Sequence, residues 1–243
     1  MIRLLASVKD EAEAQLALDA GADIIDFKNP AQGALGALAP QVIAGGLRRL
    51  AGRALTSATA GDWPLQPAML IEAVHRTGET GVDYVKLGLL PGAALDACVE
   101  ALAPLALRYR LVAVFFADRG VPAGAVDKVS RAGFAGAMVD TFDKRGGRLR
   151  QHLSDERLRA FVEAGRDLGL MTGLSGSLDL GDVPPLARMT PDLLGFRGAL
   201  CHAGARESTL SVERVQQVRA KLEASSVCAR AAGVASNLAP ARG

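Results

Sequence analysis

The chain has little cysteine and no cysteine pattern. Its three cysteines, Cys98, Cys201 and Cys228, are widely spaced, and no two of them show a metal-binding or redox spacing. An odd number of scattered cysteines does not fit the disulfide framework of a small secreted domain. We therefore expect free thiols in a reducing compartment.

Aromatic residues and net charge are also low, at 4% of the chain and a formal charge of +2. A nucleic-acid-binding surface usually needs a basic patch, and no basic run with interleaved aromatics occurs. No apolar run approaches the roughly 20 residues of a membrane span, and residues 1–10 lack the length and cleavage pattern of a signal peptide. We expect a cytoplasmic protein with no nucleic-acid and no membrane partner.

Motifs for metals and nucleotides are absent as well. The three histidines, His75, His152 and His202, are far apart, and no acidic cluster has ligand spacing. Neither a Walker-type phosphate loop nor a dinucleotide fingerprint occurs. The sequence predicts no metal and no cofactor.

What the chain does have is a regular alternation of short apolar segments and helical segments. The expected strands cover residues 2–7, 24–28, 54–59, 84–87, 111–117, 135–140, 171–174 and 193–196. The expected helices cover residues 10–20, 40–50, 67–76, 93–107, 122–132, 154–168, 183–189 and 211–223. Strands that are apolar throughout are typical of a parallel sheet buried on both faces. Eight such units predict an α/β protein with a single (β/α)8 TIM barrel over residues 1–224, and a doubly wound open sheet is the alternative.

Local signals support these boundaries. Gly21, Gly81 and Gly133 each follow a helical segment and precede a strand, as expected of a left-handed helix cap. Ser154 is a good helix N-cap. Residues 225–243 are rich in small residues without a clear period, so we expect a loosely held tail.

Lysine is scarce, and its positions are informative. The chain has six lysines against twenty-two arginines, and Lys28, Lys86 and Lys144 lie at or just beyond strand ends. Reactive groups in TIM barrels lie at the C-terminal ends of the strands. A lysine amine can form a Schiff base, whereas an arginine guanidinium cannot. These positions favour amine chemistry.

Two acids accompany these lysines. Asp26 and Lys28 are two residues apart and project to the same side of a strand, so Asp26 is a candidate proton shuttle. Lys86 is a candidate for lowering the pKa of Lys28, and Asp140 is a candidate general acid/base. The alternatives are a lysine–aspartate pair that closes the barrel, a solvated loop acid at Asp140, and a solvated or phosphate-neutralising Lys144. Spacing alone leaves open whether Lys28 or Lys86 carries the imine.

The remaining polar strand ends are candidates for binding the substrate and its phosphate. They are Ser57, Thr59, Asp118, Ser175, Gly176, Ser177, Arg197 and Gly198. The loops after the seventh and eighth barrel strands commonly hold phosphate through loop amides and a short helix. The sequence therefore predicts a phosphorylated small-molecule substrate.

Several of these segments resemble one known family. The matching segments are GADIIDFKNP at 21–30, GALGA at 33–37, SATAGD at 57–62, DYVKLG at 83–88, the Asp140 to Lys144 spacing, and GFRGA at 195–199. They resemble the (5-formylfuran-3-yl)methyl phosphate synthase family, also called 4-(hydroxymethyl)-2-furancarboxaldehyde-phosphate synthase. The resemblance covers about the first 225 residues, and it departs from the family pattern at Gln66 and at residues 202–206, which bear on phosphate contacts.

The resemblance implies a lyase with a (β/α)8 fold that condenses two glyceraldehyde 3-phosphate molecules, with loss of phosphate and water, in the synthesis of a methanofuran-type one-carbon cofactor. It implies Lys28 as the Schiff-base lysine, with Asp26, Lys86, Asp140 and Lys144 as its acid/base and charge partners. We expect a homo-oligomer that acts on a phosphorylated aldehyde. The alternatives are another Schiff-base aldolase acting on a small sugar phosphate, and a non-catalytic barrel that binds a phosphorylated ligand or serves as an assembly partner.

Overall fold

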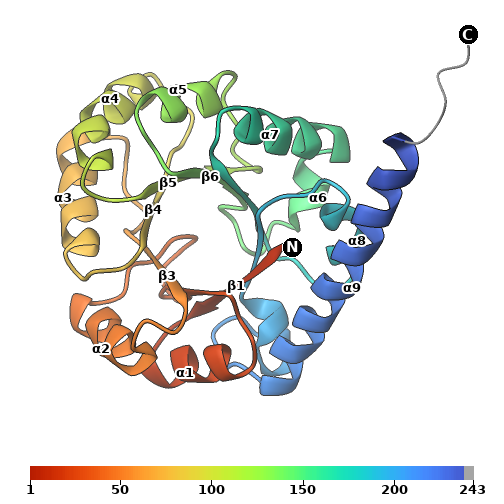
Figure 1. Cartoon of the computed structure of the whole chain (residues 1–243). Helices are drawn as coiled ribbons and strands as arrows, with labels where there is room; N and C mark the ends of the chain where they lie inside the picture. Colours follow the sequence, from red (N-terminus) through yellow and green to blue (C-terminus); the bar gives the residue numbers. More distant parts are fainter. Residues whose placement is uncertain (238–243) are drawn as a thin grey trace, which may run out of the picture.

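Eight parallel strands close into a barrel in the computed structural model of the protein (Figure 1). The structure describes the backbone of residues 1–237 and the side chains of residues 1–227. Consecutive strands are neighbours, and β1 pairs with β8 so that Arg3 lies opposite Leu193. This last pairing closes the sheet, which confirms the barrel and excludes the open sheet.

The strands and helices alternate along the chain. The strands are β1 (Arg3–Val8), β2 (Ile24–Phe27), β3 (Leu55–Thr59), β4 (Tyr84–Gly88), β5 (Leu111–Phe116), β6 (Gly136–Asp140), β7 (Met171–Leu174) and β8 (Leu193–Phe196). The helices are α1 (Glu11–Asp19), α2 (Pro40–Leu50), α3 (Pro67–Gly78), α4 (Leu95–Ala106), α5 (Ala125–Arg131), α6 (Leu149–His152), α7 (Asp155–Asp167), α8 (Val183–Ala187) and α9 (Val212–Asn237). Short 3-10 turns η1 (Gly198–Leu200) and η2 (His202–Gly204) lie between β8 and α9. The sequence missed α6, since a single helical turn is too short to show a hydrophobic period.

The predicted caps are confirmed. Gly21, Gly81 and Gly133 have φ values of +95°, +89° and +80°, a region that favours glycine because it has no Cβ. The Ser154 hydroxyl accepts a hydrogen bond from the Arg157 amide, and the Asp10 carboxylate accepts one from the Glu13 amide. The glycines lie where helices turn back into the sheet, and the two N-caps mark where α1 and α7 begin.

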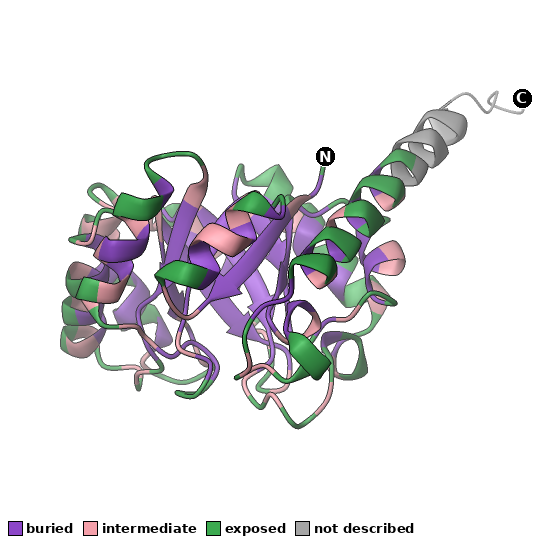
Figure 2. Ribbon diagram, turned by 90° about the horizontal axis from the view of Figure 1, so that it is seen from below, coloured by how far each residue is buried: buried purple, intermediate pink, exposed green. Residues whose placement is uncertain are grey.

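Each strand is buried on both faces, which explains why the strands do not alternate between apolar and polar residues. On β2, Ile25 and Phe27 belong to the apolar layer between the strands and the helices. Ile24 belongs to a separate apolar cluster inside the barrel. Figure 2 shows the strands as a buried layer, with exposed residues confined to the surrounding helices and loops.

The last helix differs from its prediction. We expected it to end at residue 223, but α9 continues to Asn237 and packs against α8 and β1. The predicted end is therefore wrong, because the alanines that follow residue 223 favour helix and no proline or glycine occurs between residue 223 and Gly233. The prediction of a loosely held tail falls partly on residues 238–243, which lie outside the described residues. None of the helices within residues 1–237 is long and apolar enough to cross a membrane.

Candidate active site

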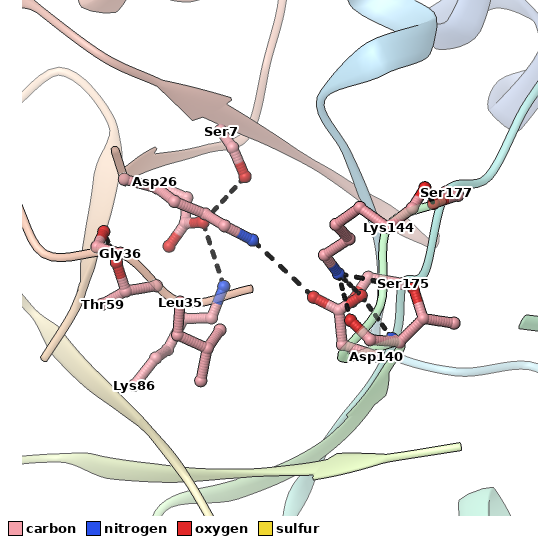
Figure 3. A network of polar contacts seen from close by, with 12 residues as sticks. Ser7, Asp26, Leu35, Gly36, Thr59, Lys86, Asp140, Lys144, Ser175 and Ser177 are labelled. Atoms are coloured by element: carbon pink, nitrogen blue, oxygen red, sulfur yellow. Dashed lines mark hydrogen bonds and ion pairs between the residues drawn. The ribbon is translucent and has the colours of Figure 1, made fainter. Parts of the chain in front are cut away.

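The side chains that point into the barrel change from apolar to polar along the strands. On β2 and just beyond it, Ile24 is followed by Asp26 and Lys28, and on β6 Met138 is followed by Asp140. The apolar members fill the barrel on the N-terminal side of the polar members. The polar members gather at the C-terminal mouth, where Figure 3 shows Asp26, Lys86 and Asp140 close together. Because the strands are parallel, all these polar ends meet at one edge.

Lys28 lies at this mouth with only 6% of its surface exposed. Its Nζ lies 3.7 Å from Asp140 Oδ2. Burial lowers the pKa of Lys28 to about 7, the nearby Asp140 carboxylate opposes this shift, and the charges of Lys144 and Lys86 reinforce it. At neutral pH roughly half of such amines are uncharged, against on the order of one in two thousand for an ordinary lysine.

Asp140 connects two lysines. Its Oδ1 accepts a hydrogen bond from Lys144 Nζ at 2.5 Å, and its Oδ2 faces Lys28. Burial alone would raise the pKa of the Asp140 carboxyl, but the charges of Lys144 and Lys28 outweigh it and hold that pKa below its usual range. The carboxylate is therefore ionised beside an amine that exchanges its proton near neutral pH.

Asp26 has a different partner from the one expected. The sequence placed it beside Lys28, but the structure pairs it with Lys86, whose Nζ lies 3.0 Å from Asp26 Oδ2. Ser7 Oγ donates to the same oxygen at 2.9 Å (Figure 3). Ser57 Oγ donates to Oδ1 at 2.6 Å. The Asp26 carboxylate is completely buried with three donors around it, so Asp140 takes the place we expected for Asp26 as the carboxylate paired with Lys28.

Two of the expected substrate-binding residues instead hold loops. Thr59 Oγ1 is completely buried and donates to the Gly36 carbonyl at 2.8 Å, which fixes the loop between β2 and α2. The Asp118 carboxylate accepts hydrogen bonds from the amides of Phe142 and Asp143 at 2.6 and 2.8 Å. Asp118 thus stabilises the turn that carries Lys144. Neither residue lines the cavity at the mouth.

The segment after β7 does line the cavity. Ser175, Gly176 and Ser177 all contribute to its wall. Ser175 Oγ donates to the Val139 carbonyl at 3.3 Å, and Ser177 Oγ donates to the Lys144 carbonyl at 3.4 Å. Gly176 has a φ of +120°, and a Cβ there would lie 3.0 Å from the Thr141 side chain. The segment therefore packs closely on the turn that carries Lys144.

Arg197 and Gly198 follow β8, and the Arg197 guanidinium is hydrogen-bonded to other groups of the protein. Its Nη1 donates to Glu13 Oε2 at 2.5 Å and to the Ser7 carbonyl at 3.1 Å. Its Nε donates to the Arg206 carbonyl and its Nη2 to the Ser208 carbonyl, both at 2.7 Å. We expected Arg197 to face a phosphate, but the structure directs its guanidinium to these acceptors.

A cavity of about 1300 Å³ opens at the mouth and is rich in cationic side chains. Besides Lys28, Lys86 and Lys144, its wall carries Arg119, Arg145, Arg148, Arg206 and Arg214. The sequence analysis named Arg206 only within residues 202–206 and did not name the other four, of which Arg119, Arg145 and Arg148 lie in loops and Arg214 lies in the first turn of α9. No group of three or more His, Cys, Asp or Glu side chains in the described part of the chain is arranged to hold a metal.

Solved structures share this fold at low sequence identity. Phosphoribosyl anthranilate isomerase from Thermus thermophilus matches with a TM-score of 0.66 and 15% identity, over 92% of this chain and 99% of its own. 3-Keto-L-gulonate-6-phosphate decarboxylase from Vibrio cholerae matches with a TM-score of 0.64 and 13% identity, over 92% and 98% of the two chains. Identities this low establish the fold and nothing about the substrate.

Fold and site together define a TIM-barrel enzyme with a buried lysine–carboxylate centre at its mouth. The family model described as 4-HFC-P synthase matches residues 4–219. The chain therefore belongs to the 4-HFC-P synthase family.

Curated relatives agree with this assignment. The (5-formylfuran-3-yl)methyl phosphate synthase of Methanopyrus kandleri is 38% identical over 217 residues, which cover 84% of this chain and 91% of the relative. The enzyme of that name from Methanococcus maripaludis strain C5 is 36% identical over 228 residues, covering 88% and 97%. A protein of Methylorubrum extorquens, provisionally given the same name, is 45% identical over 215 residues, covering 88% and 89%.

Proposed function

We propose that the protein condenses two molecules of glyceraldehyde 3-phosphate into 4-(hydroxymethyl)-2-furancarboxaldehyde phosphate through a Schiff base on Lys28. Family membership and the names of the relatives support the product. The observation that carries the mechanism is the buried Lys28 amine, whose pKa of about 7 leaves much of it uncharged beside an ionised Asp140.

The first step is the addition of the Lys28 nitrogen to the aldehyde carbon of one substrate. Asp140 takes the proton that the nitrogen loses and returns it to the carbinolamine oxygen, which then accepts a second proton, supplied by solvent, and leaves as water. The distance of 3.7 Å between the two side chains allows this transfer directly or through the reacting hydroxyl. The product of the step is a protonated imine next to a carboxylate.

The imine makes the hydrogen on the adjacent carbon acidic, because the iminium accepts the electron pair released. The resulting enamine expels phosphate from C3, or attacks the aldehyde of the second molecule. Ring closure and loss of water then give the furan, and hydrolysis frees Lys28. Two substrate molecules minus one phosphate and two water molecules equal the product, so every step is an addition, an elimination or a proton transfer.

The other charges have separate tasks. Lys144, hydrogen-bonded to Asp140, steadies the ionised carboxylate, and the Lys86–Asp26 pair keeps a second cation near the imine without a free negative charge. The Ser175–Ser177 segment is the proposed contact for phosphate at the mouth. We propose that the product serves the synthesis of a methanofuran-type one-carbon cofactor.

The decisive experiment incubates the protein with glyceraldehyde 3-phosphate alone. A conjugated furan aldehyde absorbs in the near ultraviolet, and one phosphate is released for each product formed. Reduction with borohydride in the presence of substrate should leave a mass increase on the peptide that contains Lys28. Phosphate release without near-ultraviolet absorption, or the absence of both, would overturn the proposed product. If both are absent but Lys28 still carries the borohydride adduct, the protein is a Schiff-base aldolase with another product.

Lys28→Arg tests the nucleophile. The guanidinium keeps the positive charge but forms no imine, so turnover and the adduct should both disappear while the melting temperature stays within a few degrees. Lys128→Arg is the matched control, because Lys128 lies on α5 and pairs with Asp96 outside the barrel. Turnover retained by Lys28→Arg would remove Lys28 from the mechanism.

A further inference from the structure

Two arginines follow β8, and their side chains are used differently. All three nitrogens of the Arg197 guanidinium donate to protein acceptors, and the residue is 9% exposed. Glu13, which is 3% exposed, is its charged partner and also accepts a hydrogen bond from the Leu210 amide. Arg197 thus holds the chain after β8 to β1 and α1, and although the residue lines the cavity, each of its nitrogens already donates to a protein acceptor.

Arg206 lies in the cavity wall and is half-buried. Within the described residues, the one hydrogen bond recorded for its guanidinium runs from Nη2 to the Gly33 carbonyl at 3.0 Å. Gly33 belongs to the loop that follows Lys28, so the Arg206 side chain joins the segment after β8 to the loop after β2. Burial lowers the pKa of Arg206, and the Asp140 carboxylate opposes that shift, as expected for a cation close to the reacting groups.

The backbone around Arg206 is held by Arg197. Arg197 donates to the carbonyls of Arg206 and Ser208, so the ion pair with Glu13 anchors the segment that carries the Arg206 side chain. The segment also packs directly on the strand end, because a Cβ on Gly198 would lie 3.3 Å from the Gly204 carbonyl oxygen. A change at Glu13 would therefore be transmitted to Arg206 through the Arg197 guanidinium.

We propose that Arg206 binds a phosphate group of the substrate at the Lys28 side of the mouth, and that the Glu13–Arg197 pair is the positioning element for it. A guanidinium presents a planar set of donors that matches phosphate oxygens, and a single carbonyl contact is easily exchanged for them. This site is separate from the Ser175–Ser177 segment, and two phosphorylated substrates need two such sites. The inference takes from the proposed function that the substrate is an aldehyde phosphate and that two molecules of it bind at the mouth.

The binding test uses inorganic phosphate as the probe and isothermal titration calorimetry as the measurement. Arg206→Ala should weaken phosphate binding at one site about 10- to 100-fold, as expected for the loss of a charge-assisted contact. Arg206→Lys should recover part of the loss. Arg159→Ala is the control, because Arg159 is an exposed arginine on α7, and it should leave phosphate affinity unchanged. An unchanged affinity in Arg206→Ala would overturn the site and leave Ser175–Ser177 as the place where phosphate binds.

Kinetics provide a second readout. Arg206→Ala should raise KM for glyceraldehyde 3-phosphate by about tenfold or more and change kcat much less, because the lost contact is made in the ground state. A fall in kcat with an unchanged KM would contradict a binding role.

The positioning role is tested by a double-mutant cycle. Glu13→Gln removes the charge but keeps the shape, and it should weaken phosphate binding in the wild-type background. In the Arg206→Ala background the same change should have no further effect, because Arg206 is the residue through which it acts. Additive losses would overturn the positioning role. If Glu13→Gln reduces the folded fraction, Arg197→Lys serves in the same cycle.

The proposed reaction at Lys28 and the proposed phosphate site at Arg206 can be refuted independently. Phosphate titration requires no turnover, so a missing furan product leaves the Arg206 result intact. Conversely, a failed phosphate titration leaves the borohydride adduct on Lys28 as the test of the reaction.

Discussion

Asp140→Asn should shift the pH dependence of imine formation toward acid. The carboxylate is the nearest negative charge to the Lys28 amine, with 3.7 Å between Oδ2 and Nζ, and it opposes the effect of burial on the pKa of Lys28. Asparagine keeps the shape of the side chain and removes the charge. Burial, Lys144 and Lys86 are then opposed only by the weaker effect of Asp26, so the amine should lose its proton more easily.

The size of the shift follows from Coulomb's law. Two unit charges at 3.7 Å interact with roughly 4 kcal/mol at an effective dielectric constant of about 20. At 1.36 kcal/mol for each pKa unit, the limit is about three units. Relaxation of Lys144 and entry of water reduce this, so we expect the Lys28 pKa to fall from about 7 to roughly 5–6.

The assay is single-turnover trapping with cyanoborohydride from pH 5 to pH 9, with the Lys28 adduct measured by mass spectrometry. The wild-type rate should fall on the acid side with a midpoint near pH 7. The Asp140→Asn midpoint should lie about one to two units lower, even though overall turnover drops by about 100-fold or more for want of the acid/base group. A midpoint that stays in place or moves upward would show that the amine does not interact with Asp140.

Three further predictions concern Lys28 itself and two residues near the pair. Lys86→Met removes a cation that lowers the Lys28 pKa and leaves Asp26 unpaired, so the trapping midpoint should move above pH 7; a downward move would contradict the assigned charges. Lys28→Met should raise the free energy of unfolding by about 2 kcal/mol at pH 6. Below pH 7 the Lys28 amine is charged in both the folded and the unfolded protein, so the free-energy cost of burying the charge is complete. This cost falls as the pH rises toward 10.5, where the unfolded protein also loses the proton. Urea denaturation that shows an equal gain in stability for Lys28→Met at pH 6 and pH 10 would refute this pH dependence. Asp118→Ala should cost about 1–3 kcal/mol of stability and lower kcat, because the Phe142 and Asp143 amides lose their acceptor and Lys144 its support; unchanged denaturation and kinetics would show that this contact is dispensable.

The fold was predictable because its signals are local. A strand buried on both faces must be apolar throughout, and a helix that turns directly into a strand favours glycine at its cap, as at Gly21, Gly81 and Gly133. The end of α9 was not predictable in this way. Residues beyond 223 carry no clear hydrophobic period, although their alanine content favours helix.

The sequence predicted which residues form the site better than it predicted which of them contact one another. The two-residue period of a strand and the rule that barrel chemistry lies at C-terminal strand ends were enough to bring Lys28, Lys86, Asp140 and Lys144 together. The same reasoning failed for Arg197, because its position after a strand does not reveal that its guanidinium forms an ion pair with the buried Glu13 on α1.

By itself, then, the sequence determined that eight strand ends would converge and which lysines and acids they would carry, since both depend only on local pattern and on the parallel direction of the strands. Only the tertiary structure decided which acid faces which lysine, and how basic each lysine is. Those properties depend on closure of the barrel, which brings Asp140 on β6 close to Lys28 and pairs Asp26 with Lys86. Closure also buries the Lys28 amine away from the water that would otherwise keep it protonated.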